Sequence, residues 1–360
     1  MTQPISLPRG AVVTDVQGFA LTEEDKIRLR NPNVGGVILF RRNFVSVSQL
    51  KQLVNEIKAL RTPSLVVAVD HEGGRVQRFI DGFTRIPAMA EIGQLIEQYD
   101  LNYAKDIAQK TGFVLAAELR ACGIDLSFTP VLDLDYGNCA VIGNRSFHRD
   151  PQIVSELAIS LHTGLHQGGM SSCGKHFPGH GYVSGDSHLE LPQDNRTRKE
   201  LEEDLIPFRK MIDVGMSAVM PAHVVYQKID KYPAGFSKYW LENTLRQELG
   251  FQGIIFSDDL TMEGASIAGN IIDRANESFR AGCDVVLVCN QPELTDELIS
   301  NLPNTHNEEL SKRWEMVAGK YHQDHFIKML QTDGFRRLSQ QINELGTKTI
   351  NNINAPKVGE

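Results

Sequence analysis

The residues best suited to chemistry in this 360-residue chain are charged side chains that directly follow short apolar runs. Asp70 and Glu72 follow one run, Lys175 and His176 follow another, and Asp258 follows a third. Charged groups in such places are costly to bury unless they are paired or used. Carboxylates combined with arginine, lysine and histidine donors, with no evident phosphate-binding loop, favour a ligand rich in hydroxyl groups, such as a sugar.

Three residues have the types that cleavage of a glycosidic bond requires. Such cleavage needs a carboxylate that attacks or stabilises the sugar carbon, and an acid that protonates the leaving oxygen. Asp258 stands at the end of an apolar run, where a strand would hold it rigidly enough to attack. Asp186 and His188 are two positions apart, so a turn there would let the carboxylate orient the imidazole and favour its charged form. Histidine titrates near neutrality and can therefore both donate and accept a proton.

Eight short apolar runs, separated mostly by helix-like segments, must position these residues. The runs are Ala11–Val16, Gly36–Phe40, Leu65–Val69, Ile124–Pro130, Met170–Gly174, Ser217–Pro221, Gly253–Ser257 and Asp284–Cys289. Most are continuously apolar, as in strands that are buried on both faces. Eight strands alternating with helices predict an α/β fold, a single (β/α)8 TIM-type barrel whose site lies at the strand ends. A doubly wound open sheet is the alternative with the same alternation.

Capping patterns and the order of the strand ends predict how the rest of the chain is organised. Helices are expected to begin at Ser46 with Gln49, at Asp150 with Pro151, and at Thr197 with Glu200. The candidate residues come from strand ends three, four, five and seven, so no cut between those strands would leave a complete site. We therefore expect one domain over residues 1–360, with the barrel at about 10–300 and a C-terminal helical extension at about 301–350.

Composition excludes several classes of protein. The net charge is −8, with 37 basic and 45 acidic residues, which argues against a nucleic-acid partner. No stretch reaches the roughly 18 apolar residues of a membrane span, and the first ten residues show no apolar signal segment. The five cysteines are scattered without a CxxC pair, which is typical of reduced, buried thiols. We expect a cytoplasmic protein without membrane insertion, and a monomer.

Four motifs at these strand ends closely resemble those of family 3 glycoside hydrolases. They are VDHEGGRVQR from Val69, IGNRSF from Ile142, KHFPGHG from Lys175 followed by DSH from Asp186, and FSDDL from Phe256. The resemblance covers about residues 15–290. Within the family, the sequence looks like the single-domain bacterial β-N-acetylglucosaminidases of peptidoglycan recycling. It implies a β-N-acetylhexosaminidase that needs no cofactor. It also implies a substrate in which N-acetylglucosamine is β-1,4-linked to 1,6-anhydro-N-acetylmuramic acid, with or without peptide.

The resemblance also implies a role for each matching residue. Asp258 matches the nucleophile that forms a covalent glycosyl-enzyme, His188 the general acid/base, and Asp186 its partner. The residues expected to bind N-acetylglucosamine are Asp70, Arg78, Arg145, Lys175 and His176. Larger family members take the acid/base from a second domain, for which this chain has no room. The DSH loop is expected to replace it in a retaining double displacement.

Three alternatives remain at this point. The acetamido oxygen of the substrate could attack instead, with Asp258 only polarising it. A metal-dependent barrel hydrolase would draw on the histidines near the strand ends, but the chain has no HxH pair on an early strand, so no metal is expected. A non-catalytic sugar-binding barrel would keep Asp70, Arg145 and Lys175 but would have no need of Asp258 or the DSH loop.

Overall fold

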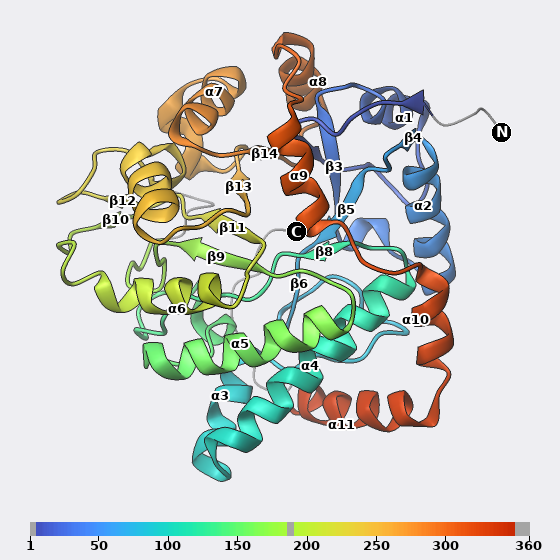
Figure 1. Ribbon diagram of the computed structural model, residues 1–360, viewed down its shortest axis with the longest axis vertical. Helices are drawn as coiled ribbons and strands as arrows, with labels where there is room; N and C mark the ends of the chain where they lie inside the picture. Colours follow the sequence, from blue (N-terminus) through green and yellow to red (C-terminus); the bar gives the residue numbers. More distant parts are fainter. Residues whose placement is uncertain (1–4, 186–190, 350–360) are drawn as a thin grey trace.

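A computed structural model describes residues 5–185 and 191–349 of the chain. Its centre is one parallel eight-stranded sheet with the order β8-β5-β3-β2-β14-β13-β11-β9 (Figure 1). The strands are β2 (Val12–Thr14), β3 (Val34–Leu39), β5 (Val66–Val69), β8 (Leu126–Ser127), β9 (Cys173–Phe177), β11 (Ala218–Pro221), β13 (Ile254–Asp259) and β14 (Val285–Val288). Each of the eight apolar runs therefore contains a strand of this sheet or overlaps one.

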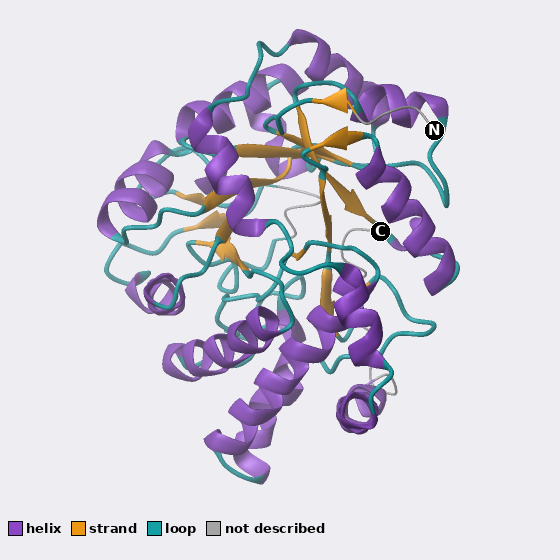
Figure 2. Ribbon diagram, turned by 45° about the vertical axis from the view of Figure 1, so that its right-hand side comes forward, coloured by secondary structure: helices purple, strands orange, loops and turns teal. Residues whose placement is uncertain are grey.

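The sheet curls until its two edges nearly meet. Isolated bridges join Leu126 to Ser171 and Val131 to Lys175, which connect the β8 edge with the β9 edge. The first strand of the sheet, β2, pairs with the last, β14, with Val13 opposite Leu287. Figure 2 shows the strands gathered at the centre and the helices outside them. The predicted barrel is thus confirmed, and the open-sheet alternative is wrong.

Two strands extend further at their carboxyl ends than their apolar runs predict. The run Met170–Gly174 predicts that Lys175 and His176 follow the fifth strand, but β9 spans Cys173–Phe177 and contains both. Likewise, β13 spans Ile254–Asp259 and contains Asp258. Apolarity marks only the part of a strand that needs no polar partner. Charged residues continue these two strands because the site supplies partners for them.

Helices surround the sheet and connect successive strands. Their bounds are α1 (Glu23–Leu29), α2 (Val47–Ala59), α3 (Met89–Gln98), α4 (Leu101–Ala121), α5 (Pro151–Gln167), α6 (Glu202–Asp213), α7 (Ile271–Ala281), α8 (Pro292–Asn301), α9 (Glu308–Val317), α10 (Gln323–Leu330) and α11 (Asp333–Thr349). A π-helical segment, Tyr239–Glu248, follows β11. The short strand pairs are β1 (Ile5–Ser6) with β4 (Arg61–Thr62), β6 (His71–Gly73) with β7 (Val76–Gln77), and β10 (Gln193–Asp194) with β12 (Val225–Tyr226).

One of the three predicted helix starts is correct in full. Asp150 caps α5 and Pro151 is its first residue. Ser46 caps α2 through the backbone N–H of Gln49, but the Gln49 side chain accepts from Val45 instead of closing a capping box. The Thr197–Glu200 contacts form in a turn, and α6 starts only at Glu202. Such local side-chain bonds stabilise turns as well as helix starts, and here the turn prevails.

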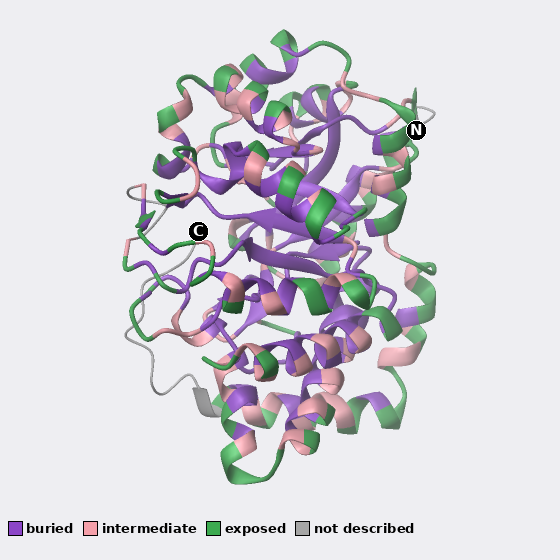
Figure 3. Ribbon diagram, turned by 60° about the vertical axis from the view of Figure 1, so that its left-hand side comes forward, coloured by how far each residue is buried: buried purple, intermediate pink, exposed green. Residues whose placement is uncertain are grey.

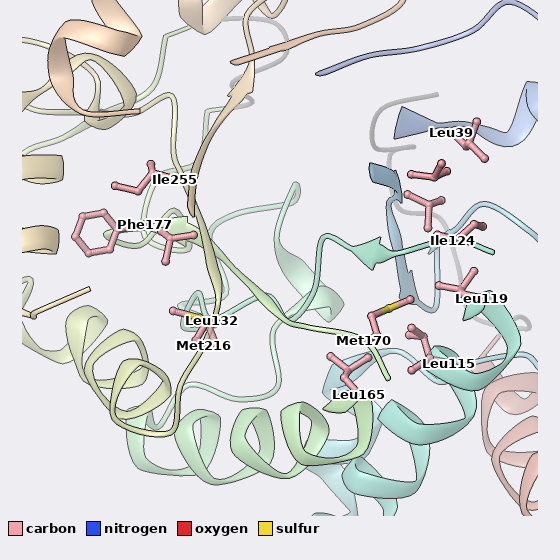
Figure 4. Packing of buried hydrophobic residues seen from close by; sticks show 14 of the residues in the cluster. Leu39, Leu115, Leu119, Ile124, Leu132, Leu165, Met170, Phe177, Met216 and Ile255 are labelled. Atoms are coloured by element: carbon pink, nitrogen blue, oxygen red, sulfur yellow. The ribbon is translucent and has the colours of Figure 1, made fainter. Parts of the chain in front are cut away.

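The core has an outer layer between sheet and helices and an inner layer inside the barrel. Along β13, Ile255 belongs to the outer layer, whereas Ile254 and Phe256 belong to the inner one. In Figure 4, Leu115 and Leu119 of α4 and Leu165 of α5 belong to the outer layer. Figure 3 shows the strands almost wholly buried, with the exposed residues on the outer faces of the helices. Burial on both faces explains why the strands are apolar without alternation.

Two of the C-terminal helices are integral to the barrel. On α9, Trp314 is fully buried at the amino ends of the strands, where its indole N–H donates to the Gly10 carbonyl at 2.9 Å. Its ring lies 5.7 Å from that of Phe256 in the barrel interior. On α11, the Ser339 and Thr84 hydroxyls are 2.6 Å apart. Helix α11 therefore supports the segment that follows the β6–β7 hairpin.

Candidate functional site

A pocket of about 280 Å³ opens at the carboxyl ends of the strands. Six of the residues predicted for the site line it: Asp70, Arg78, Arg145, Lys175, His176 and Asp258. They come from β9 and β13 and from the segments that follow β5, β7 and β8, which are far apart in the sequence. Asp186 and His188, the predicted acid/base pair, lie outside the described residues.

A buried ionic network forms one side of the pocket, with Glu72 at its centre. Both carboxylate oxygens of Glu72 accept from the Arg145 guanidinium at 2.8 Å, and the Lys175 ammonium lies 2.7 Å from the same carboxylate. The Glu72, Arg145 and Lys175 side chains are each at most 4 % exposed. Burial works to raise the pKa of Glu72, but the two cations outweigh it and hold that pKa well below its usual range.

Asp70 continues this network into the pocket. Its carboxylate accepts from Lys175 at 2.8 Å and lies 3.6 Å from Arg78. Although burial works to raise the pKa of Asp70, Lys175 and Arg78 hold it below its usual value, so Asp70 is ionised at neutral pH. The Asp70 side chain is 22 % exposed, which leaves acceptor capacity for hydroxyl groups of a ligand.

His176 is oriented by Asp133, which lies just after β8. The Asp133 carboxylate is 2.8 Å from the Nδ1 atom of His176 and also accepts from the backbone N–H groups of His176 and His180. His176 lines the pocket with its ring held by this contact. Burial lowers the pKa of His180 to about 4, so His180 is neutral and lines the wall without charge.

The opposite wall is an irregular part of the β13–β14 pair that carries Asp258. The register shifts between Phe256 and Asp259, and side chains there replace missing ladder bonds. Ser257 Oγ accepts from the backbone N–H of Leu287 at 3.0 Å, and Asp259 Oδ1 accepts from that of Cys289 at 3.2 Å. Such an irregularity changes the direction in which one side chain of the strand points. Here the residue between Ser257 and Asp259 is Asp258, which lines the pocket.

Asp259 sits in a different electrostatic environment from the ionic network. Its carboxylate accepts from the backbone and the hydroxyl of Thr261, at 3.0 and 2.8 Å. Burial raises the pKa of Asp259 to about 7, and the charge of Asp258 adds to that rise. Asp258 itself accepts from the Asp259 backbone N–H at 2.8 Å. Asp259 is thus held by hydrogen bonds from Thr261 and Cys289.

Sequence reasoning left two important residues of the site unassigned. It gave no role to Glu72, which is the central acceptor of the ionic network, or to Asp133, which holds His176. The signal was present, because both acids follow apolar runs, at positions where burial without a partner is costly. Which base pairs with which acid depends on the closure of the barrel, and spacing along the chain does not determine that.

The described residues contain no helix that could cross a membrane. Among them there is also no group of three or more His, Cys, Asp or Glu side chains arranged to hold a metal ion.

Comparison with known proteins identifies the family. Residues 10–317 match the family described as Glycosyl hydrolase family 3 N terminal domain. The chain is 60 % identical over 337 residues to a beta-hexosaminidase of Neisseria meningitidis (serogroup A), covering 93 % of each protein. It is 54 % identical over 357 residues to a beta-hexosaminidase of Chromobacterium violaceum, covering 99 % of each.

The fold agrees with a solved structure of the same kind. The crystal structure of NagZ from Neisseria gonorrhoeae in complex with N-trifluoroacetyl-D-glucosamine superimposes with a TM-score of 0.92 and 57 % identity. The match covers 95 % of this chain and 99 % of that one. The resemblance found in the sequence motifs is thereby confirmed, as is the expectation of a β-hexosaminidase enzyme. The chain belongs to glycosyl hydrolase family 3.

Proposed function

We propose that the protein is an exo-acting, retaining β-N-acetylhexosaminidase that releases N-acetylglucosamine from the non-reducing end of peptidoglycan fragments. The observation that carries this proposal is the pocket, in which Asp258 lines the same small cavity as Asp70, Arg145 and Lys175. A carboxylate opposite a set of fixed charged donors and acceptors is suited to bind a sugar ring and attack its anomeric carbon. A small pocket with an ionic wall favours cleavage at a chain end.

The proposed reaction divides the pocket into two functional halves. Asp70, Arg78, Arg145, Lys175 and His176 bind the hydroxyl groups of the N-acetylglucosamine ring. In the first step Asp258 attacks the anomeric carbon and the glycosidic bond breaks. His188, oriented by Asp186, protonates the leaving oxygen. In the second step His188 takes a proton from water, which attacks the glycosyl-Asp258 ester and releases the sugar with retained configuration.

Two further points support this substrate. The relative from Neisseria gonorrhoeae binds N-trifluoroacetyl-D-glucosamine, an analogue of N-acetylglucosamine. The sequence motifs resemble those of enzymes that act on N-acetylglucosamine linked to 1,6-anhydro-N-acetylmuramic acid. We propose that the chain acts on such muropeptides in the cytoplasm during cell-wall recycling. On this proposal it works as a monomer and as one domain over residues 1–360, without a cofactor.

Product analysis tests the proposed function. The enzyme should hydrolyse 4-nitrophenyl N-acetyl-β-glucosaminide much faster than the matching β-glucoside, and should release N-acetylglucosamine from GlcNAc-β-1,4-anhydro-N-acetylmuramic acid. Proton NMR at early times should show the β-anomer first. Release of the α-anomer first would contradict the retaining mechanism, and failure to cleave either glucosaminide would contradict the function.

Substrate-assisted attack by the acetamido oxygen also gives retention, so a second measurement must distinguish the two mechanisms. A 5-fluoro glycosyl fluoride of N-acetylglucosamine slows breakdown of a covalent intermediate. Mass spectrometry of a digest should then find the sugar on the peptide that contains Asp258. Inactivation or turnover without any label on that peptide would favour the acetamido oxygen as the nucleophile.

A further inference from the structure

A second recess lies beside the catalytic pocket on the same face of the barrel. It has a volume of about 300 Å³ and is lined by Asp15, Val16, Gln17, Asp25, Arg28, Arg42, Asn290 and Pro292. We call it the rim recess. Asp15 follows β2, Arg42 follows β3 and Asn290 follows β14, so its polar groups also come from carboxyl ends of strands. Asn290 lines both the rim recess and the catalytic pocket, which makes the two cavities immediate neighbours.

Arg42 is held in place at the boundary between the two cavities. Its guanidinium lies 4.6 Å from the ring centre of Phe40, which lines the catalytic pocket. One guanidinium nitrogen donates to the Asn290 side chain at 2.7 Å, and the other terminal nitrogen donates to Asp15. Asp15 also accepts from the Asn290 backbone N–H at 2.6 Å. These contacts orient Arg42 before any ligand arrives, which lowers the entropy cost of binding one.

Arg42 differs from the other arginines that line the two cavities in how much of its side chain is exposed. Arg28, Arg78 and Arg145 have side chains that are 4, 6 and 4 % exposed, whereas that of Arg42 is 35 % exposed. A guanidinium has five N–H donors, and among the described residues Arg42 uses two of them. The remaining donors suit a carboxylate, which arginine binds with two parallel hydrogen bonds.

Each of the two aspartates that line the rim recess is paired with an arginine. Arg42 is bonded to Asp15, and Arg28 is bonded to Asp25 and also, through two hydrogen bonds, to Asp296. Gln17 is exposed on the recess lining and offers an amide to hydroxyl groups. The volumes of the two cavities, about 280 and 300 Å³, are similar, so each suits one ring of a disaccharide.

We propose that the rim recess binds the leaving group, a sugar that carries a carboxylate, and that Arg42 is the residue that selects for this carboxylate. The proposal rests on the proposed function, because it assigns the neighbouring pocket to the N-acetylglucosamine ring. It adds a specificity-determining residue outside the set that contacts that ring. Arg42 takes no part in bond cleavage, so its effect depends on which leaving group the substrate has.

Three substrates that differ in the leaving group test this proposal. In 4-nitrophenyl N-acetyl-β-glucosaminide the leaving group is not a sugar. In N,N′-diacetylchitobiose it is a neutral sugar, and in GlcNAc-β-1,4-N-acetylmuramic acid it is a sugar that carries a carboxylate. Arg42→Met should lower kcat/KM for the carboxylated disaccharide about tenfold, mainly through KM, and should change the other two less than about twofold. The matched control is Arg41→Met. Arg41 is exposed, and its side chain has no hydrogen bond or ion pair among the described residues, so all three rates should stay unchanged.

The outcomes separate this proposal from the proposed function. An equal loss on all three substrates would mean that Arg42 supports the pocket wall, and no loss on the carboxylated disaccharide would mean that another group binds the carboxylate. Either result overturns the role of Arg42. Because Arg42→Met leaves Asp15 without its cation, Arg42→Lys is measured in parallel, with thermal unfolding as the check on folding. Lysine keeps the charge but not the two parallel donors, so it should lose selectivity partly. Failure of the wild type on the aryl glucosaminide would instead overturn the proposed function.

Discussion

The two walls of the catalytic pocket use opposite electrostatic arrangements. On one wall Asp70 and Glu72 are bonded to Lys175 and Arg145, and cations hold the pKa of both acids low. On the β13–β14 wall, Asp259 is held by hydrogen bonds from Thr261 and Cys289, and burial raises its pKa to about 7. The first arrangement keeps Asp70 and Glu72 ionised and in fixed positions, which suits the binding of a ligand. The second holds Asp259 by hydrogen bonds and in a mainly protonated form below about pH 7, beside Asp258, the proposed nucleophile.

Asp258 gives the most severe test of this difference between the two walls. Asp258→Asn keeps the shape of the β13–β14 wall but removes the proposed nucleophile, so kcat/KM should fall about 10⁴-fold. Thermal unfolding should match the wild type, because Asn keeps an oxygen to accept from the Asp259 backbone. A variant that retained wild-type turnover would show that the reactive wall lies elsewhere.

Breaking the ionic wall should cost stability as well as activity. Glu72→Gln leaves the buried Arg145 and Lys175 without their shared carboxylate, and the free energy of unfolding should fall by about 3–5 kcal/mol. The control is Glu203→Gln, whose pair with Arg149 is exposed and should contribute about 0–1 kcal/mol. Urea unfolding of both variants measures the difference. Equal, small losses would mean that the network is not electrostatically important.

The raised pKa of Asp259 predicts a pH dependence of stability opposite in sign to that of the ionic wall, whose acids have lowered pKa values and lose their contribution as the pH falls. The folded state holds this proton up to about pH 7, whereas the unfolded chain releases it near the ordinary value of 3.8. The protonated form therefore contributes stability that is fully present below about pH 4 and is lost as the pH rises through 7. Asp259→Asn should flatten the change in unfolding free energy between pH 4 and 7, as measured by urea titration.

A matched control comes from a second buried acid far from the pocket. Glu118 on α4 accepts from the backbone and hydroxyl of Thr84, and burial raises its pKa to about 7 as well. Glu118→Gln should flatten the stability profile in the same range of pH but leave the pH profile of hydrolysis unchanged. Asp259→Asn should alter both, because Asp259 adjoins Asp258. An unaltered hydrolysis profile in Asp259→Asn would separate Asp259 from the chemistry.

The smallest expected effect concerns the hydrogen bonds that shape the β13–β14 wall. Ser257→Ala removes the acceptor of the Leu287 backbone N–H and should lower the free energy of unfolding by about 1–2 kcal/mol. Because this irregular part of β13 orients Asp258, kcat should fall more than KM changes. Ser155→Ala on α5 removes a hydroxyl that bonds only within its own helix and should leave the kinetics unchanged. A loss of stability with unchanged kcat would mean that the orientation of Asp258 does not depend on Ser257.

The sequence permitted accurate prediction where a signal is local or is repeated. Eight apolar runs predicted eight barrel strands, and six site residues at their ends do line one pocket. The partners of those residues were not predictable, since Glu72 meets Arg145 only through a contact 73 residues apart in the chain. The end of β9 was misplaced for the same reason. Lys175 looks like a loop residue until its two buried carboxylates are known.

The pairing of β2 with β14 has a consequence for synthesis on the ribosome. Val13 emerges early but finds Leu287 only after nearly the whole barrel has been translated. Until then the nascent chain presents apolar strands with an unpaired edge, a state prone to aggregation. Trp314, which closes the amino end of the barrel, emerges later still. Chaperone dependence should therefore be greatest just before Leu287 and Trp314 emerge.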